Sequence, residues 1–187
     1  SGCDINVVPV WKKISTGNQD VVVSVVDGGV DFKHEDLKDN MWRNPDQKGD
    51  NVYGYNFATN TYNVSPEDHG THVAGTIAAV NNNGKGLCGI AGGNSKKKVK
   101  GVKIMSCQVY VGNNWGDCEA AIKWGADHGA VISQNSWGHV YKTPEEATEK
   151  WNERKEALPK YSSPFLEKAE LNSKKNIIKK IKERVKN

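Results

Sequence analysis

The sequence predicts an α/β fold: an open, mainly parallel sheet with helices on both faces, followed by a helical C-terminal tail. Two observations predict the sheet. An almost unbroken β-branched run near the amino terminus is typical of a strand covered on both faces. Strand patterns then alternate with helical patterns, which is typical of parallel sheets. A third observation, a sharp change of composition after Gly138, separates the tail.

The predicted elements follow in a strand–helix–strand order. Val21 to Val26 forms the first strand, and His69 to Val80 carries small and apolar residues at helical spacing. Val102 to Val111 is the second strand, and Cys118 to His128 is the second helix, closed by a glycine. A third strand begins within Ala130 to Ser133.

Residues 139–187 form a region of their own by composition. All 19 glycines lie at or before Gly138. The remaining residues hold 13 Lys and Arg against 8 Glu, so this tail carries a net charge of +5 and residues 1–138 carry −1. Pro144 opens a predicted helix that runs to about Leu158, and Ser163-Pro164 is typical of the start of a second helix. We therefore expect a glycine-free, Lys-rich helical tail.

Composition argues against two classes of partner. The net charge of +4 comes from the tail. The sequence lacks the concentrated basic face that is typical of a nucleic-acid-binding protein. No run of about 18 apolar residues is present, so no membrane span is expected. No basic-then-apolar leader opens the sequence. The sequence thus predicts neither nucleic acid nor a membrane as a partner.

The four cysteines are spaced too widely for a zinc ribbon or a CxxC redox site. They are Cys3, Cys88, Cys107 and Cys118. Their spacing is compatible with one disulfide and equally with free thiols.

Two short segments carry the residues on which a chemical function could rest. Asp27 follows the first strand and precedes Gly28-Gly29, at the end of a strand where open α/β sheets place their ligands. Taken alone, this segment favours an aspartate that caps a turn. His69 lies at the start of the first helix in His-Gly-Thr-His-Val-Ala-Gly-Thr. His69 and His72 share a helix face and could share a metal, but no third ligand stands at metal spacing, so a metal-dependent hydrolase is a remote alternative.

Together these segments resemble the subtilase family of serine endopeptidases (peptidase family S8). Asp-x-Gly after an apolar strand is followed about 40 positions later by HGTHVAGT, in the family's order of acid before histidine. The resemblance continues through Asp31–Leu37, Gly86–Gly93, the strand VKIMSCQVY and Ser136-Trp137-Gly138, so it covers about residues 5–138. Gly28 departs from the pattern, because the family usually has Ser or Thr there.

The resemblance implies the roles of the site residues. Asp27 would be the acid and His69 the general base of an Asp-His-Ser triad, in which the imidazole deprotonates a serine and the carboxylate orients the imidazole. Ser136-Trp137-Gly138 resembles the strand that pairs with an extended peptide substrate. Trp137 would line a specificity pocket, or it is a buried aromatic residue at a strand end.

A structural calcium site is implied in the same way. Residues 80–86 (VNNNGKG) resemble the family's calcium loop in length and asparagine content, and Asp36 lies where the family supplies a carboxylate. The expected ligands are oxygens, which suit calcium: those of Asp36, Val80, Asn82, Gly84 and Gly86. The alternative is a plain Asn/Gly turn after a helix. No organic cofactor is expected.

The nucleophilic serine and the oxyanion asparagine of the family are not recognisable. Both occur in glycine-containing motifs, and no glycine follows Gly138. Ser163 precedes a proline at a predicted helix start, but a helix N-cap explains it, and Asn135 lies too early in the chain for the oxyanion role. We expect an inactive, truncated part of a secreted or cell-envelope enzyme that acts on peptides or proteins. The alternative is a non-catalytic, protease-like binding module.

A sheet that lacks its later strands would leave an edge open. The sequence therefore predicts that the tail helices cover this edge, that the chain associates with itself, or that it binds a missing C-terminal half.

Overall fold

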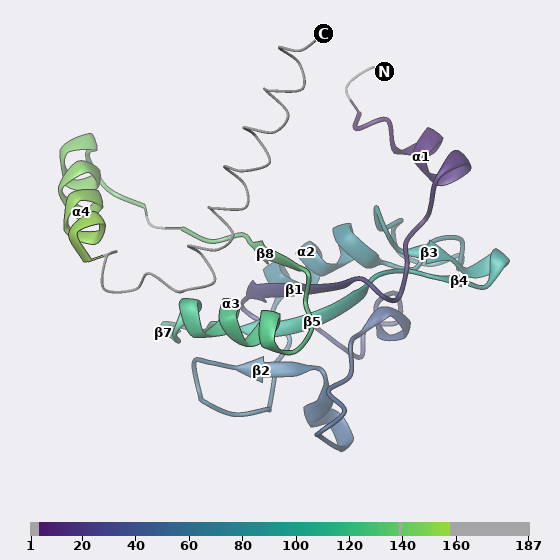
Figure 1. Cartoon of the computed structure of the whole chain (residues 1–187), viewed down its shortest axis with the longest axis horizontal. Helices are drawn as coiled ribbons and strands as arrows, with labels where there is room; N and C mark the ends of the chain where they lie inside the picture. Colours follow the sequence, from purple (N-terminus) through teal and green to yellow (C-terminus); the bar gives the residue numbers. More distant parts are fainter. Residues whose placement is uncertain (1–3, 139, 158–187) are drawn as a thin grey trace, which may run out of the picture. The chain divides into compact units, whose positions relative to one another are not determined.

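The computed structural model describes residues 4–138 and 140–157. The chain divides into two compact units, Ser1–Trp137 and Gly138–Asn187. The first unit contains a four-stranded sheet in the order β2-β5-β1-β8, in which every pairing is parallel (Figure 1). Its strands are β1 (Val22–Asp27), β2 (Gly54–Asn56), β5 (Lys103–Gln108) and β8 (Ile132–Asn135). The predicted parallel sheet is confirmed.

Helices cover both faces of this sheet. One face of β1 presents Val23 and Val25 to α2 (Asp68–Ala78), through Ala74 and Ala78. The other face presents Val22 and Val26 to α3 (Cys118–Asp127), through Ala121. Because alternate residues of a strand point to opposite faces, every residue of β1 is buried, as its run of valines predicts.

The second predicted strand is shorter than expected. β5 ends at Gln108, and the chain then forms a hairpin of β6 (Tyr110–Val111) and β7 (Asn114–Trp115) instead of continuing to Val111. The amide N–H of Val109 donates to the carbonyl of Asp27 at 2.8 Å as the last bond of the parallel ladder, and the carbonyl of Val109 accepts from the amide of Gly116. The hairpin therefore turns back over the carboxyl end of β1.

The third strand begins at Ile132, within the predicted range of residues 130–133. The amide of Ala130 donates to the carbonyl of Gly125 at 2.9 Å, which keeps Ala130 at the end of α3. Among the described strands, β8 pairs only with β1 and lies at the edge of the sheet. Val131 and Ile132 are 69% and 51% exposed, so the predicted open edge is apolar.

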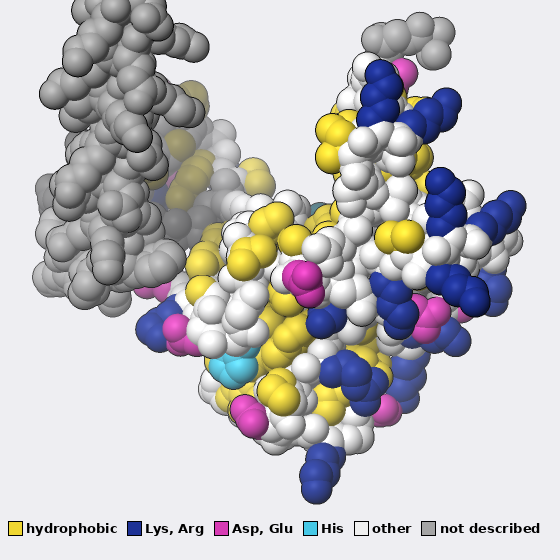
Figure 2. All heavy atoms as spheres, turned by 45° about the vertical axis from the view of Figure 1, so that its right-hand side comes forward, with side chains coloured by type: hydrophobic (Ala, Val, Ile, Leu, Met, Phe, Trp, Pro, Cys, Tyr) yellow, Lys and Arg dark blue, Asp and Glu magenta, His cyan; other side chains and the backbone are white. Residues whose placement is uncertain are grey.

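Smaller elements complete the first unit. They are α1 (Val7–Lys13), the 3₁₀ turns Lys38–Asn40, Gly49–Val52 and Ser95–Lys97, and the ribbon of β3 (Gly93–Asn94) with β4 (Val99–Lys100). α1 buries none of its residues, although the Trp11 indole donates to the carbonyl of Ile90 at 2.7 Å. Figure 2 shows lysine, arginine and hydrophobic side chains interspersed over one face of the molecule.

The second unit contains α4 (Pro144–Ala157), which agrees with the first helix predicted for the tail. The second predicted helix, with Ser163, lies outside the described residues. Among the helices in the described ranges, none combines the length and the hydropathy that a membrane crossing requires.

Candidate active site

The site begins at the carboxyl end of the central strand β1. Asp27 is its last residue and is 1% exposed. Asp27 Oδ1 accepts a hydrogen bond of 2.7 Å from the amide of Gly28. Burial of a carboxylate requires such donors, because an unpaired charge away from water is strongly unfavourable.

His69 reaches this carboxylate from the first turn of α2. Glu67 caps the helix by accepting from the amide of Gly70 at 3.0 Å. His69 Nδ1 lies 2.9 Å from Asp27 Oδ1, although 42 positions separate the two residues. The His69 side chain is 51% exposed, whereas that of Asp27 is 1% exposed. The buried acid therefore holds one ring nitrogen of an accessible imidazole.

The carboxylates around His69 favour its charged form. The hydrogen bond and the charge of Asp27 raise the pKa of His69 above its ordinary value, and the charge of Glu67 adds to this effect. An imidazole with Nδ1 held by a carboxylate has Nε2 left to take a proton from a further group. This arrangement can therefore act as a general base whose cation is stabilised as it forms.

Tyr110 is a third partner of the acid that the sequence analysis did not single out. Its hydroxyl donates to Asp27 Oδ1 at 2.9 Å. Burial, followed by the hydrogen bond to Asp27, raises the pKa of Tyr110, so the hydroxyl stays protonated at neutral pH. The one sequence signal near it is Gly28, which departs from the family pattern next to Asp27.

The predicted substrate segment follows β8 directly. Asn135 pairs with Val26, so Ser136 comes one position beyond this pair, at the same carboxyl end of the parallel strands as Asp27. Ser136 Oγ accepts from Gln134 at 2.8 Å. Trp137 packs against the core cluster between the sheet and α3, and its Nε1 is buried with no hydrogen-bond partner in the described residues. Trp137 is half-buried, so both interpretations of it, a wall of a specificity pocket and an aromatic residue at a strand end, stay predictions.

Of the residues expected to bind calcium, Val80 and Gly86 lie next to Asp36, whose side chain is buried. Asp36 is 2% exposed; its Oδ2 accepts from the amide of Leu87 at 3.0 Å and its Oδ1 from Asn83 Nδ2 at 2.5 Å. The amide of Val80 donates to the carbonyl of Asp36 at 2.9 Å, which fixes the start of the loop beside it. Asn83, which the sequence analysis did not name, is thus the asparagine that touches Asp36.

Two features of this loop concern its fit to a hard cation. A Cβ at Gly86 would overlap the Asp36 carboxylate, so the glycine lets the loop approach the charge closely. The nearby ammonium of Lys85 pairs with Glu35 at 2.6 Å instead of with Asp36. A buried carboxylate, with no cationic side chain bonded to it in the described residues, is the type of oxygen ligand that calcium prefers.

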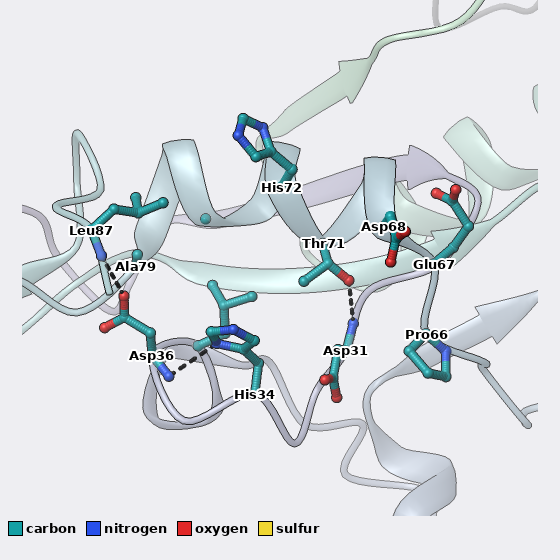
Figure 3. A pocket seen from close by; sticks show the side chains of 12 residues that line it. Asp31, His34, Asp36, Pro66, Glu67, Asp68, Thr71, His72, Ala79 and Leu87 are labelled. Carbon is teal, nitrogen blue, oxygen red and sulfur yellow. Dashed lines mark hydrogen bonds between the residues drawn. The ribbon is translucent and has the colours of Figure 1, made fainter. Parts of the chain in front are cut away.

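His72 does not join His69 in a metal cluster. In the described part of the chain, the group of three or more ligand residues within 4.8 Å of one another is Asp27, Glu67 and His69. His72 instead lines a pocket of about 460 Å³ on the outer side of α2, where it points away from Asp31 and Thr71 (Figure 3). The carboxylates of Asp31 and Asp36 also line this pocket.

Comparison with known proteins identifies the family. The sequence model of the subtilase family matches residues 18–176. The chain belongs to the subtilase family. The matched region of this subtilase extends past Gly138, where its recognisable motifs end.

Two curated relatives and one solved structure illustrate the similarity. The chain is 38% identical over 138 residues to fervidolysin of Fervidobacterium pennivorans, covering 68% of this chain and 18% of the relative. It is 35% identical over 141 residues to the halolysin-like extracellular serine protease Nep of Natrialba magadii, covering 72% and 23%. The crystal structure of an Aeromonas sobria serine protease in complex with a chaperone matches with a TM-score of 0.51 at 22% identity, covering 71% and 22%, and supports the fold alone. This subtilase chain therefore spans about a fifth of the length of the relatives it matches.

Proposed function

We propose that this subtilase chain supplies the acid and the general base of a site that hydrolyses peptide bonds. The observation that carries the proposal is the 2.9 Å contact between His69 Nδ1 and Asp27 Oδ1, which links a buried carboxylate to an exposed imidazole. Membership of the subtilase family supports serine-type chemistry over the other uses of such a pair.

In the proposed reaction, His69 Nε2 takes the proton of a serine hydroxyl while the serine oxygen attacks the carbonyl carbon of the peptide. Asp27 stabilises the imidazolium and keeps the ring in the correct tautomer. His69 then returns the proton to the leaving amine, and a water molecule repeats the sequence to release the acyl group. The backbone of Ser136–Gly138 would hold the substrate as an added strand.

The serine must come from outside the motifs recognisable in this sequence. No glycine follows Gly138, so the Gly-Thr-Ser turn of the family does not occur there. Loss of the serine lowers the turnover of a subtilase by about 10⁶. We therefore propose that the chain alone is inactive and that a segment corresponding to the rest of a subtilase domain completes it. This segment would pair with the free edge of β8, a strand that runs parallel to β1 and has exposed apolar side chains.

Two further features belong to the proposed function. The loop of residues 80–86, with Asp36, would bind a calcium ion that stabilises the fold. The protein would act outside the cell or at its envelope, because one relative is named as an extracellular serine protease.

Active-site labelling tests this proposal. A fluorophosphonate probe is added to the purified chain, to a recombinant C-terminal segment of a related subtilase, and to their mixture. We expect labelling only in the mixture, on the serine of the added segment, and loss of labelling with H69A. Labelling of the chain by itself would contradict the proposal that the chain alone contains no nucleophilic serine. Formation of a complex that is never labelled would favour the non-catalytic binding module.

A further inference from the structure

The Asp27 carboxylate has an uneven set of hydrogen-bond partners. Oδ1 accepts from the Gly28 amide at 2.7 Å, and both the Tyr110 hydroxyl and His69 Nδ1 lie 2.9 Å from it. Oδ2 is buried and has no partner in the described residues. Tyr110 therefore provides the one side-chain hydroxyl that the described residues direct at this acid.

The Tyr110 ring occupies the space that a side chain at position 28 would need. A Cβ built on Gly28 would overlap Tyr110 Cε2, and it would lie 2.7 Å from Tyr110 Cζ and 2.8 Å from Glu67 Oε2. The family usually carries Ser or Thr at this position. The glycine and the tyrosine thus depend on each other sterically: the ring could not keep this position if residue 28 carried a side chain.

We propose that Tyr110 is a positioning residue for the catalytic acid, and that its hydroxyl replaces the one usually found on residue 28. The proposal deepens the proposed function and rests on it for its catalytic meaning. The hydrogen bond itself can be tested without catalysis.

Contacts on both sides hold Tyr110 over the acid. Its ring packs against Trp115 with 5.0 Å between ring centroids, across the hairpin of β6 and β7. Gln108 Nε2 donates to the carbonyl of Gly28 at 2.6 Å and lies 3.4 Å from the carbonyl of Tyr110, which links the backbones of these two residues through one side chain. The hydroxyl therefore has a fixed approach to Oδ1.

The hydroxyl should lower the proton affinity of His69. A donor on Oδ1 stabilises part of the carboxylate charge, so less of that charge is available to the imidazolium. The charged groups that act on His69 are Asp27 and Glu67, both of which raise its pKa. Tyr110 is neutral and opposes the contribution of Asp27.

Substitution of the hydroxyl alone tests this effect. In Y110F, we expect the pKa of His69, measured by NMR titration of its ring signals in the full chain, to rise by about half a unit. We also expect the Hδ1 resonance to move downfield as the bond to Asp27 strengthens. Y53F is the matched control, because the Tyr53 hydroxyl accepts from Arg43 at 2.8 Å instead of binding an acid. An unchanged His69 titration in Y110F would overturn the proposal.

Exchange of the two positions provides a second test. G28S alone should lower the midpoint of unfolding, because the introduced side chain would overlap the Tyr110 ring. Y110A should raise the pKa of His69 as Y110F does, and G28S in the Y110A background should bring it back toward the wild-type value. If G28S destabilises both backgrounds equally and the His69 pKa does not return, the proposal that the Tyr110 hydroxyl replaces a hydroxyl on residue 28 is contradicted. These measurements need no nucleophile, so failure of serine complementation leaves their outcome unaffected.

Discussion

The backbone carbonyl of Gly29 lies against the Cα of Gly70, so closely that no side chain fits between them. A Cβ on Gly70 would also lie 3.2 Å from Asp27 Oδ1. This close approach brings the first turn of α2 onto the end of β1, and it places His69, the preceding residue, within reach of the acid. The hydrogen bond of the candidate pair thus depends on two glycines that contribute no side chain to it.

Substitution of Gly70 by alanine should destabilise the protein. Alanine normally stabilises a helix interior by about 1 kcal/mol relative to glycine. Here the methyl group would overlap the Gly29 carbonyl, and we expect a net loss of about 2–4 kcal/mol in the free energy of unfolding, measured with urea. G75A is the matched control in the same helix, because a Cβ there would meet only Leu87 Cδ2 at 3.9 Å. Equal effects of G70A and G75A would contradict this account of the packing.

Removal of the negative charge at Asp27 should lower the pKa of His69. Asp27 is the main cause of its raised value, so D27N should return the NMR titration of the ring toward the ordinary value of about 6.5. A histidine whose pKa is raised by folding stabilises the folded state at pH values below its pKa in the unfolded chain. This stabilisation is lost as the pH rises through its pKa in the folded chain. The stability difference between wild type and D27N should therefore be larger near about pH 5.5 than near about pH 8.5. A difference independent of pH would exclude this coupling.

Calcium should raise the melting temperature through Asp36. We expect an increase of about 5 °C or more in millimolar calcium relative to EDTA, since the ion binds only the folded chain. D36N should abolish this increase, whereas D39N, at an exposed aspartate of the same segment, should retain it. An identical response of both variants to calcium would place the ion elsewhere.

The cysteines should differ in reactivity in the order of their exposure. Cys88, Cys107 and Cys118 are free thiols; Cys88 is exposed, Cys107 is buried and Cys118 is intermediate. Burial raises the pKa of the Cys107 thiol, which disfavours the reactive thiolate. We expect a thiol reagent to modify Cys88 quickly and Cys107 only after unfolding, as mass spectrometry of the digested protein would show. Rapid modification of Cys107 in the native chain would contradict its placement in the core.

The open edge of β8 should cause self-association in the absence of a partner. Sedimentation velocity at increasing concentration should show oligomers, because Val131 and Ile132 are exposed beside unpaired backbone groups. I132K should reduce association by placing a charge at this edge. I122K, at an apolar residue of α3 that is 37% exposed, is the control and should leave association unchanged. A wild-type chain that stays monomeric at all concentrations would contradict this prediction.

Local patterns in the sequence were enough to predict the parallel sheet and the helices that cover it. The valine run of β1 predicted that both faces of this strand are buried, because a strand with one face in water would alternate apolar with polar residues. The small residues of α2 indicated a helix that packs closely on the sheet. Asp27 and His69 were recognisable because their motifs include glycines that this packing requires. Strand ends were less accurate, since β5 ends where the chain turns into the β6–β7 hairpin and the carbonyl of Val109 accepts from Gly116, which no local pattern records.

The sequence by itself determined which residues could form an acid–base pair and which strand carries the acid. The tertiary structure alone decided that Tyr110 shares that acid and that Asn83 is the asparagine in contact with Asp36. It also decided that His72 lines a pocket in which His69 takes no part. Some of these contacts join residues far apart in the chain, and others depend on which of two neighbouring side chains points toward the site. Both are set by the packing of helix, sheet and hairpin, which sequence periodicity does not specify.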